Sequence, residues 1–252
     1  MNKKQIATLI NALLNKPTRL YEKFHQRTKL KIVVATETKS IPEAWKKTFY
    51  KSYPRLSTLV LPDPDMPPIS LTKAFKQRKS ERKFGRAPLS LEKLSTLLFY
   101  TAGKKDKTSQ TRFYPSAGAR YPIETYCISL NTELPKGLYH YNLKNNTVEL
   151  LLSLSTFNVD TYFGQSWMES AACIMVFTAV FERTTIKYGE RGYRHVLFDA
   201  GAMTQNAYVM STALHLNICA VGGYKADVLN DLLDIDGLHE TVVGVVVCGE
   251  KP

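Results

Sequence analysis

Residues 171–214 read AACIMVFTAVFERTTIKYGERGYRHVLFDAGAMTQNAYVMSTAL. Ala171–Phe181 is a near-continuous apolar run, which predicts a strand covered on both faces. Val196–Leu214 is mostly small or apolar and contains no Pro, which predicts a buried helix. Between them, KYGERGYRH (Lys187–His195) predicts a turn that carries a Lys-Tyr pair and further titratable side chains. This order is typical of a chemical group mounted on a buried scaffold.

The flanking sequence alternates strand and helix patterns. Aliphatic and aromatic runs predict four more strands, at Ile123–Leu130, Gly137–Tyr141, Val148–Leu152 and Thr241–Cys248. Ser70 and Ser90 are placed to cap helices, and Ala226–Leu233 predicts a short helix before the last strand. Helices mixed with strands in this order predict an α+β fold with a mostly antiparallel central sheet and surrounding helices.

Residues 1–68 are expected to form an N-terminal accessory helical arm, and residues 69–252 the main domain. The arm shows helical patterning, an apolar run and a possible helix start, at Ile6–Leu14, Leu20–Phe24, Leu30–Ala35 and Ser40–Trp45. The Pro-rich stretch LPDPDMPP (Leu61–Pro68) suits neither helix nor central strand, so it is interpreted as the connection.

Composition is that of a globular protein, with 252 residues, 44% hydrophobic content and a formal net charge of +12. The charge fits either an anionic partner or a solvated, solubilising surface. The four cysteines are far apart and lie in apolar runs, so core thiols are expected and no metal site is predicted. No apolar run is long enough to span a membrane, and the expected location is cytoplasmic.

Two stretches have features of a ligand site. In RKSERKF (Arg78–Phe84), Arg78, Ser80 and Arg82 alternate with Lys79 and Glu81, so an extended segment would present the three side chains together. Two guanidiniums and a hydroxyl are suited to binding a phosphate. Basic residues at a helix end also neutralise its terminal carbonyls, which is the simpler interpretation. In YPSAGARYP, the small residues Ser116–Ala119 allow a flat ligand to approach the backbone, although an ordinary turn has the same composition.

Several of these motifs together resemble the SagB-type dehydrogenases, which are flavin-dependent azoline oxidases of the nitroreductase-like superfamily. The motifs are RKSERKF, PSAGARYP, GLYHYN, RTTIKYGERGYRH, DAGAMTQNAYVMSTALHLNICAVGGY and the closing VVVCGE. The resemblance extends over about residues 20–250, and the motifs occur in the same order as in the family.

The resemblance implies a nitroreductase-like fold and a homodimer with FMN at the subunit interface. By analogy, the FMN phosphate, ribityl chain and pyrimidine edge would be held by Arg78, Ser80 and Arg82. Backbone and hydroxyl groups near the flavin would come from Gly222 and Gly223, and from the partner subunit's loop at Ser116, Ala117 and Gly118. Family members often have a basic residue directly after the final strand's Gly, where this chain has Glu250, and this departure argues against a phosphate role for Lys251.

The family's catalytic pair corresponds to Lys187 and Tyr188. The implied reaction removes a proton from a thiazoline or oxazoline ring carbon and transfers a hydride to the flavin, giving the azole. The ordinary pKa is about 10.4 for Lys and about 10 for Tyr, so neither side chain is deprotonated at neutral pH unless the site lowers its pKa. Either of them is a candidate base. The nearby cations Arg183, Arg191 and Arg194 would favour that deprotonation. The alternative is a solvated turn without catalytic function.

The resemblance also implies partners, namely an azoline-containing precursor peptide and a separate cyclodehydratase complex that makes the azolines. A first rival function is a general NAD(P)H-dependent flavin reductase for nitroaromatics or quinones. A second is a basic nucleic-acid-binding protein without flavin, but the aromatic residues do not alternate with the basic ones as that function requires. Neither nucleic acid nor membrane is an expected partner.

Overall fold

The computed structural model describes residues 19–30, 42–45, 50–106, 108 and 110–252. The chain divides into two compact units, residues 1–40 and 41–252. In the first unit, α2 (Leu20–Arg27) confirms the helical patterning predicted at Leu20–Phe24. The predicted helix at Ile6–Leu14 and almost all of the apolar run at Leu30–Ala35 lie outside the described residues.

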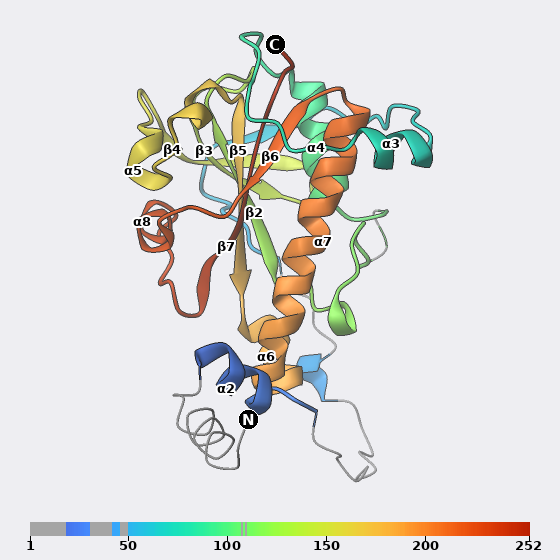
Figure 1. Ribbon diagram of the computed structural model, residues 1–252, viewed down its shortest axis with the longest axis vertical. Helices are drawn as coiled ribbons and strands as arrows, with labels where there is room; N and C mark the ends of the chain where they lie inside the picture. The colour runs from blue at the N-terminus through green and yellow to red at the C-terminus, as the bar shows by residue number, and fades with distance from the viewer. Residues whose placement is uncertain (1–18, 31–41, 46–49, 107, 109) are drawn as a thin grey trace, which may run out of the picture. The chain divides into compact units, whose positions relative to one another are not determined.

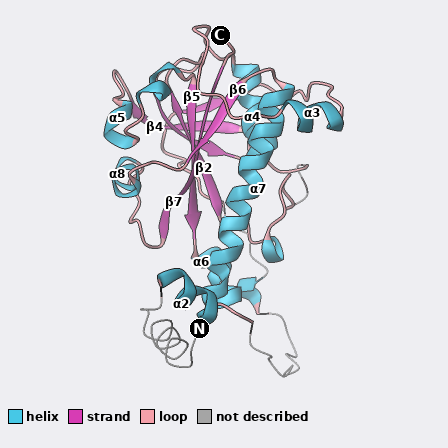
Figure 2. Cartoon of the chain, in the orientation of Figure 1, coloured by secondary structure: helices cyan, strands magenta, loops and turns pink. Residues whose placement is uncertain are grey.

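The second unit is built on a seven-stranded sheet with the order β1-β4-β3-β2-β5-β7-β6 (Figures 1 and 2). Every neighbouring pair is antiparallel, as predicted. Because β2 and β5 carry apolar residues on both sides, they occupy the buried centre of the sheet. The strands are β1 (Thr58–Val60), β2 (Ile123–Ser129), β3 (Gly137–Asn142), β4 (Thr147–Ser153), β5 (Cys173–Val180), β6 (Asn217–Val221) and β7 (Glu240–Gly249).

Helices cover both faces of this sheet, which confirms the α+β class. Two of them begin at the predicted caps: Ser70 Oγ accepts the amide of Lys73, and Ser90 Oγ accepts that of Lys93. The α-helices are α3 (Leu71–Gln77), α4 (Leu91–Ala102), α5 (Val159–Tyr162), α6 (Glu182–Tyr188), α7 (Gly192–Ala213) and α8 (Ala226–Leu232). The 3-10 helices are η1 (Glu43–Trp45), η2 (Ala117–Ala119), η3 (Ser166–Ser170) and η4 (Gly189–Arg191).

The core has two layers, one on each face of the sheet. On one face, the leucines of α4 and the small residues of α7 pack against β2 and β5. On the other face, α5 and α8 pack against the same strands. All four cysteines are buried and free, as expected for core thiols. Within the described residues, no helix has the length and apolar character needed to cross a membrane.

The structure corrects one prediction about the opening stretch. Lys187 and Tyr188 do not lie in a turn; they form the last turn of α6, and Gly189 ends that helix with φ +55°. The long helix begins at Gly192, four residues before the predicted start. β-branched Thr184 and Ile186 have low helix propensity, which hides α6 in the sequence. Burial of one side of α6 against the rest of the fold overrides that propensity.

Candidate active site

The predicted clamp lies on an extended segment that leaves α3 and runs beside β6. The amide of Glu81 donates to the carbonyl of Ile218 at 2.7 Å, which fixes the segment to the strand. Ser80 Oγ lies 2.7 Å from the hydroxyl of Tyr208 on α7, and the Arg78 guanidinium lies 5.3 Å from the centre of the same ring. Tyr208 therefore holds two of the three clamp residues together.

The third clamp residue connects to the glycine pair. The Arg82 guanidinium lies 5.8 Å from the ring centre of Trp167, and Trp167 Nε1 donates to Gln165 at 3.0 Å. The Gln165 amide in turn donates to the carbonyl of Gly223 at 3.0 Å. The structure thus brings Arg78, Ser80, Arg82, Gly222 and Gly223 together along β6, and we call these five residues the clamp group.

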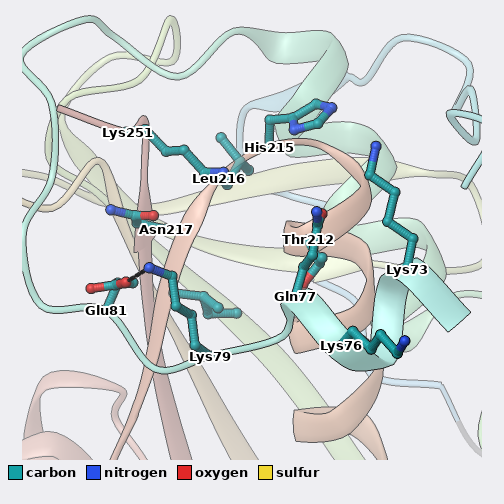
Figure 3. A pocket seen from close by; sticks show the side chains of 11 residues that line it. Lys73, Lys76, Gln77, Lys79, Glu81, Thr212, His215, Leu216, Asn217 and Lys251 are labelled. Atoms are coloured by element: carbon teal, nitrogen blue, oxygen red, sulfur yellow. Dashed lines mark ion pairs between the residues drawn. The ribbon is translucent and has the colours of Figure 1, made fainter.

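A basic cavity of about 440 Å³ lies next to the clamp group (Figure 3). Lys79 and Glu81, which alternate with the clamp side chains, form an ion pair at its edge. Other side chains in its lining include Lys73, Lys76, His215 and Lys251. Glu250 is paired with Lys93 at 2.7 Å and is absent from this lining. The positive charge of the cavity suits an anionic group.

Lys187 and Tyr188 lie against the predicted small-residue loop. Gly118 has φ +60°, and a Cβ added there would lie 2.6 Å from Tyr188 Oη and 3.0 Å from Lys187 Nζ. A side chain at position 118 would therefore displace the ends of Lys187 and Tyr188, and its backbone would be strained at this positive φ. The ring of Trp45 lies 5.5 Å from Lys187 Nζ, and a flat aromatic face is a favourable neighbour for an ammonium ion. We call Ser116, Ala117, Gly118, Lys187 and Tyr188 the pair group.

Two buried arginines hold the elements of the pair group in place. Arg120 Nε donates to the carbonyl of Arg183 at 2.5 Å, and its Nη1 donates to the carbonyl of Trp45 at 2.8 Å. Arg183 forms a buried ion pair with Glu124 of β2 at 2.5 Å. This pairing differs from the sequence-based expectation, because the charge of Arg183 is compensated by Glu124 and is not free to act on Lys187.

Glu124→Gln is expected to destabilise the fold by about 3–5 kcal/mol, because it leaves the buried Arg183 charge unpaired. Burial raises the pKa of Glu124, but the hydrogen bond with His140 and the Arg183 charge outweigh it and lower the pKa to about 2. The contribution of the Glu124 carboxylate to the free energy of unfolding should therefore be fully present above its ordinary pKa of 4.5 and be lost as the pH falls towards 2. Urea unfolding measures both effects, and exposed Glu169→Gln is the matched control. A loss below about 1 kcal/mol would contradict the assignment.

The structure does not bring the two groups together within one chain. Tyr208 anchors the clamp group near the C-terminal end of α7, whereas the pair group lies at the N-terminal end (Figure 1). From Gly192 to Tyr208 the helix axis rises by about 24 Å, at about 1.5 Å per residue. A general base must lie within about 3 Å of the proton that it removes. One chain alone therefore leaves the predicted base far from the predicted phosphate clamp.

Sequence reasoning missed several residues that shape these groups. Tyr208 and Trp167 lie in runs that resemble ordinary core, and nothing in their spacing indicates contact with an arginine. Trp45 was expected only as part of a short helix. Asp199 lies within the predicted apolar helix, and its carboxyl is buried, with the residue only 3% exposed. The sequence shows the polar members of the site but not the side chains that orient them.

Known proteins resemble most of this chain. The model of the nitroreductase family matches residues 75–250. A protein of Methanocaldococcus jannaschii that is named as a nitroreductase is 30% identical over 181 residues, covering 71% of this chain and 91% of that protein. A Ralstonia eutropha structure described as a nitroreductase has a TM-score of 0.68 and 26% identity, covering 77% of this chain and 90% of that one. These findings confirm the expected fold.

Two further relatives are peptide-processing proteins. The microcin B17-processing protein McbC of Escherichia coli is 30% identical over 169 residues, or 63% of this chain and 61% of McbC. The trifolitoxin-processing protein TfxB of Rhizobium leguminosarum bv. trifolii is 26% identical over 208 residues, or 74% of this chain and 56% of TfxB. The chain thus spans less than two thirds of the length of either protein.

The fold also occurs in a solved assembly. A chain of the E. coli microcin synthetase McbBCD complex, with truncated pro-MccB17 bound, has a TM-score of 0.62 and 23% identity. The match covers 100% of this chain and 95% of that one. At this level of identity, the match shows a shared fold.

Proposed function

The chain belongs to the nitroreductase family, and we propose that it is an FMN-dependent dehydrogenase that converts peptide thiazolines or oxazolines to thiazoles or oxazoles. The observation that carries the proposal is the joint contact of Lys187 and Tyr188 with the exposed loop at Gly118. A simple flavin reductase has no need of such a pair. The relatives named for processing microcin B17 and trifolitoxin support the same choice of substrate class.

The clamp group has the chemistry that FMN requires. Neither Arg78 nor Arg82 forms an ion pair within the described part of the chain, and each lies over an aromatic ring that leaves its N–H edge available. Two such guanidiniums suit the phosphate and the pyrimidine carbonyls of FMN. The exposed backbone at Gly222 and Gly223 allows a planar ring to approach closely. The neighbouring basic cavity adds positive charge near the phosphate end.

The pair group supplies the proton chemistry. When bound, the flavin would supply the acceptor for the hydride that leaves the azoline ring. Lys187 and Tyr188 would take the proton from the neighbouring ring carbon, in a position that Arg120, Arg183 and Glu124 hold fixed. An ammonium ion at Lys187 would stabilise negative charge on the adjacent phenol oxygen. We therefore assign Tyr188 as the base and Lys187 as its electrostatic partner.

A homodimer would complete the site. The clamp group of one chain and the pair group of the second would then face the same flavin, which resolves their separation along α7. Exposed apolar side chains on α6 and α7 support this arrangement, because Phe198 is 72% exposed and Ile186 is 54% exposed. Tyr193 and Leu197 on α7 are also exposed.

The proposed partners are an azoline-containing precursor peptide and a cyclodehydratase that supplies its azolines. An oxidase acts only on rings that another enzyme has closed, so this reaction must follow a cyclodehydration. The similar chain in the microcin synthetase complex lies in an assembly with a bound precursor, and this precedent supports the proposal.

In air, where molecular oxygen reoxidises the flavin, the purified protein is expected to be yellow and to convert an azoline peptide to its azole, with a mass loss of two hydrogens per ring. The rival function is a general NAD(P)H-dependent nitroreductase or quinone reductase, which the relative from M. jannaschii favours by its name. Anaerobic NADPH separates the two. Rapid bleaching by NADPH without azole formation would support the rival, whereas azole formation without NADPH supports the dehydrogenase.

A further inference from the structure

Four lysines from three parts of the fold line the basic cavity next to the clamp group (Figure 3). They are Lys73 and Lys76 of α3, Lys79 of the extended segment, and Lys251 near the end of the chain. Glu81 is the one carboxylate in the described lining, and it is already paired with Lys79. Among the described residues, the other three lysines have no ion-pair partner. The cavity therefore keeps an excess of positive charge.

Neutralising the end of α7 does not account for this charge. Lysines beside the last turn of a helix often serve as partners for its carbonyl groups. Here the carbonyl of Met210 accepts the amide of Leu214 at 2.8 Å, and the carbonyl of Ser211 accepts the amide of Leu216 at 2.8 Å. The backbone thus satisfies these carbonyls by itself, and the ammonium groups remain available to a ligand.

The cavity is separate from the clamp. In an extended segment, successive side chains point to opposite sides. Lys79 and Glu81 line the cavity, whereas no member of the clamp group is part of its described lining. Arg78 and Ser80 instead contact Tyr208. The segment therefore offers one set of side chains to the proposed FMN phosphate and a second set to another anion.

The chemistry of the lining favours a chain of carboxylates over a nucleotide. Its volume of about 440 Å³ falls within the range of about 300–1,000 Å³ for ligand pockets, which is more room than one phosphate group fills. In the part of the chain that the structure describes, the lining contains no arginine fork for a phosphate and no Phe, Tyr or Trp for stacking on a base. Its cations are lysines and one histidine, which act as separate point charges.

The spacing of the lysines also suits a peptide. Lys73 and Lys76 lie one turn apart on α3, where Cβ atoms are separated by about 5–6 Å. Alternate side chains of an extended peptide are separated by about 6.5–7 Å, so two acidic residues of one strand can reach both lysines. Gln77 and Thr212 in the same lining have side chains that can hydrogen-bond a peptide backbone.

We propose that this cavity binds an acidic segment of the precursor peptide, outside the ring that is oxidised. The inference rests on the proposed function, which makes a peptide the substrate. Carboxylates of the segment would pair with Lys73, Lys76 and Lys251. These contacts lie away from the reacting atoms and are the same in the ground state and the transition state, so they would strengthen peptide binding without changing the chemical step.

The test is the binding of fluorescein-labelled hexaglutamate to the full-length protein, measured by fluorescence anisotropy at physiological ionic strength. Lys73→Glu combined with Lys76→Glu should weaken binding by about tenfold or more, because two attractive pairs become repulsive. Lys136→Glu combined with Lys144→Glu is the matched control, since it changes the net charge equally at exposed positions outside the cavity. The control should weaken binding by less than about threefold. Equal losses in the two double variants would overturn the inference.

Glu81→Gln should give a gain of binding, which a folding defect cannot imitate. The change removes the one carboxylate of the described lining and releases Lys79 from its ion pair. Hexaglutamate should therefore bind about three- to tenfold more tightly than it does to wild type. Unchanged or weaker binding by Glu81→Gln would contradict the proposal.

Competition experiments identify the anion. Unlabelled hexaglutamate should displace the labelled peptide more effectively than hexathymidylate or inorganic phosphate at the same concentration. Stronger displacement by either phosphate compound would overturn the assignment to a peptide.

FMN binding separates this inference from the proposed function. In the Lys73→Glu and Lys76→Glu double variant, FMN affinity should fall by less than about threefold, because the clamp group does not line the cavity. A loss as large as that for hexaglutamate would place the FMN phosphate in the cavity and overturn the inference. A wild type that binds FMN and forms azoles but does not bind hexaglutamate would overturn this inference alone. Absence of FMN binding in wild type would overturn the proposed function, and with it the precursor peptide as the occupant.

Discussion

Lys187→Ala is expected to leave FMN bound and to lower azole formation by about 10²–10⁴-fold, the usual contribution of a positioned proton-transfer group. The flavin should remain because the clamp group is anchored at the other end of α7, through Tyr208. The chemistry should fail because Lys187 Nζ and the Tyr188 hydroxyl meet at Gly118 as a single unit. Flavin absorbance and peptide mass spectrometry measure the two outcomes separately.

Tyr188→Phe should cause a loss of similar size, because it removes the proposed base and keeps the ring. Exposed Lys144→Ala is the control, and it should turn over at the wild-type rate. The double variant should be no worse than either single one, since residues that act as a unit are not additive. Wild-type turnover by Lys187→Ala would show that the pair has no catalytic role.

The fold follows from local signals that agree with one another. Ser70 and Ser90 precede apolar periodic runs, and both cap the helices that follow. The strand patterns of β2 and β5 are nearly continuous because both faces of those strands are covered. Asn146, in the turn between β3 and β4, has φ +51°, a conformation that Asn adopts readily. Each of these features depends on only a few neighbouring residues, and for that reason the sequence alone predicts them.

The site was harder to predict because its geometry depends on contacts between distant residues. The ion pair between Glu124 and Arg183 joins β2 to α6, and no local pattern indicates it. Low-propensity residues in α6 concealed the helix that carries Lys187 and Tyr188. The alternation of Arg78, Ser80 and Arg82 did predict their common neighbourhood, but Tyr208 and Trp167 orient them. Most of all, the sequence did not indicate that the length of α7 separates the clamp from the pair.

That separation leads to the second large expected effect, which is the recovery of activity from two inactive proteins. A chain with Arg78→Ala and Arg82→Ala should fail to hold FMN, and a chain with Lys187→Ala should hold it but not react. When the two are refolded or expressed together, about half of the dimers contain one chain of each kind. Each such dimer has one site with an intact clamp group and an intact pair group. Azole formation should therefore return to about a quarter of the wild-type level.

The result depends on which chain supplies each group, and this makes it decisive. If one chain supplied both groups, every site in a mixed dimer would carry one defect, and no activity would return. A mixture of Lys187→Ala with Tyr188→Phe is the matched control, because both changes damage the pair group and no intact site can form. Recovery in the first mixture and none in the control would place Lys187 and Tyr188 opposite the partner's flavin. If neither mixture recovers activity, the base acts on a flavin held by its own chain. That outcome would contradict the separation of the two groups along α7.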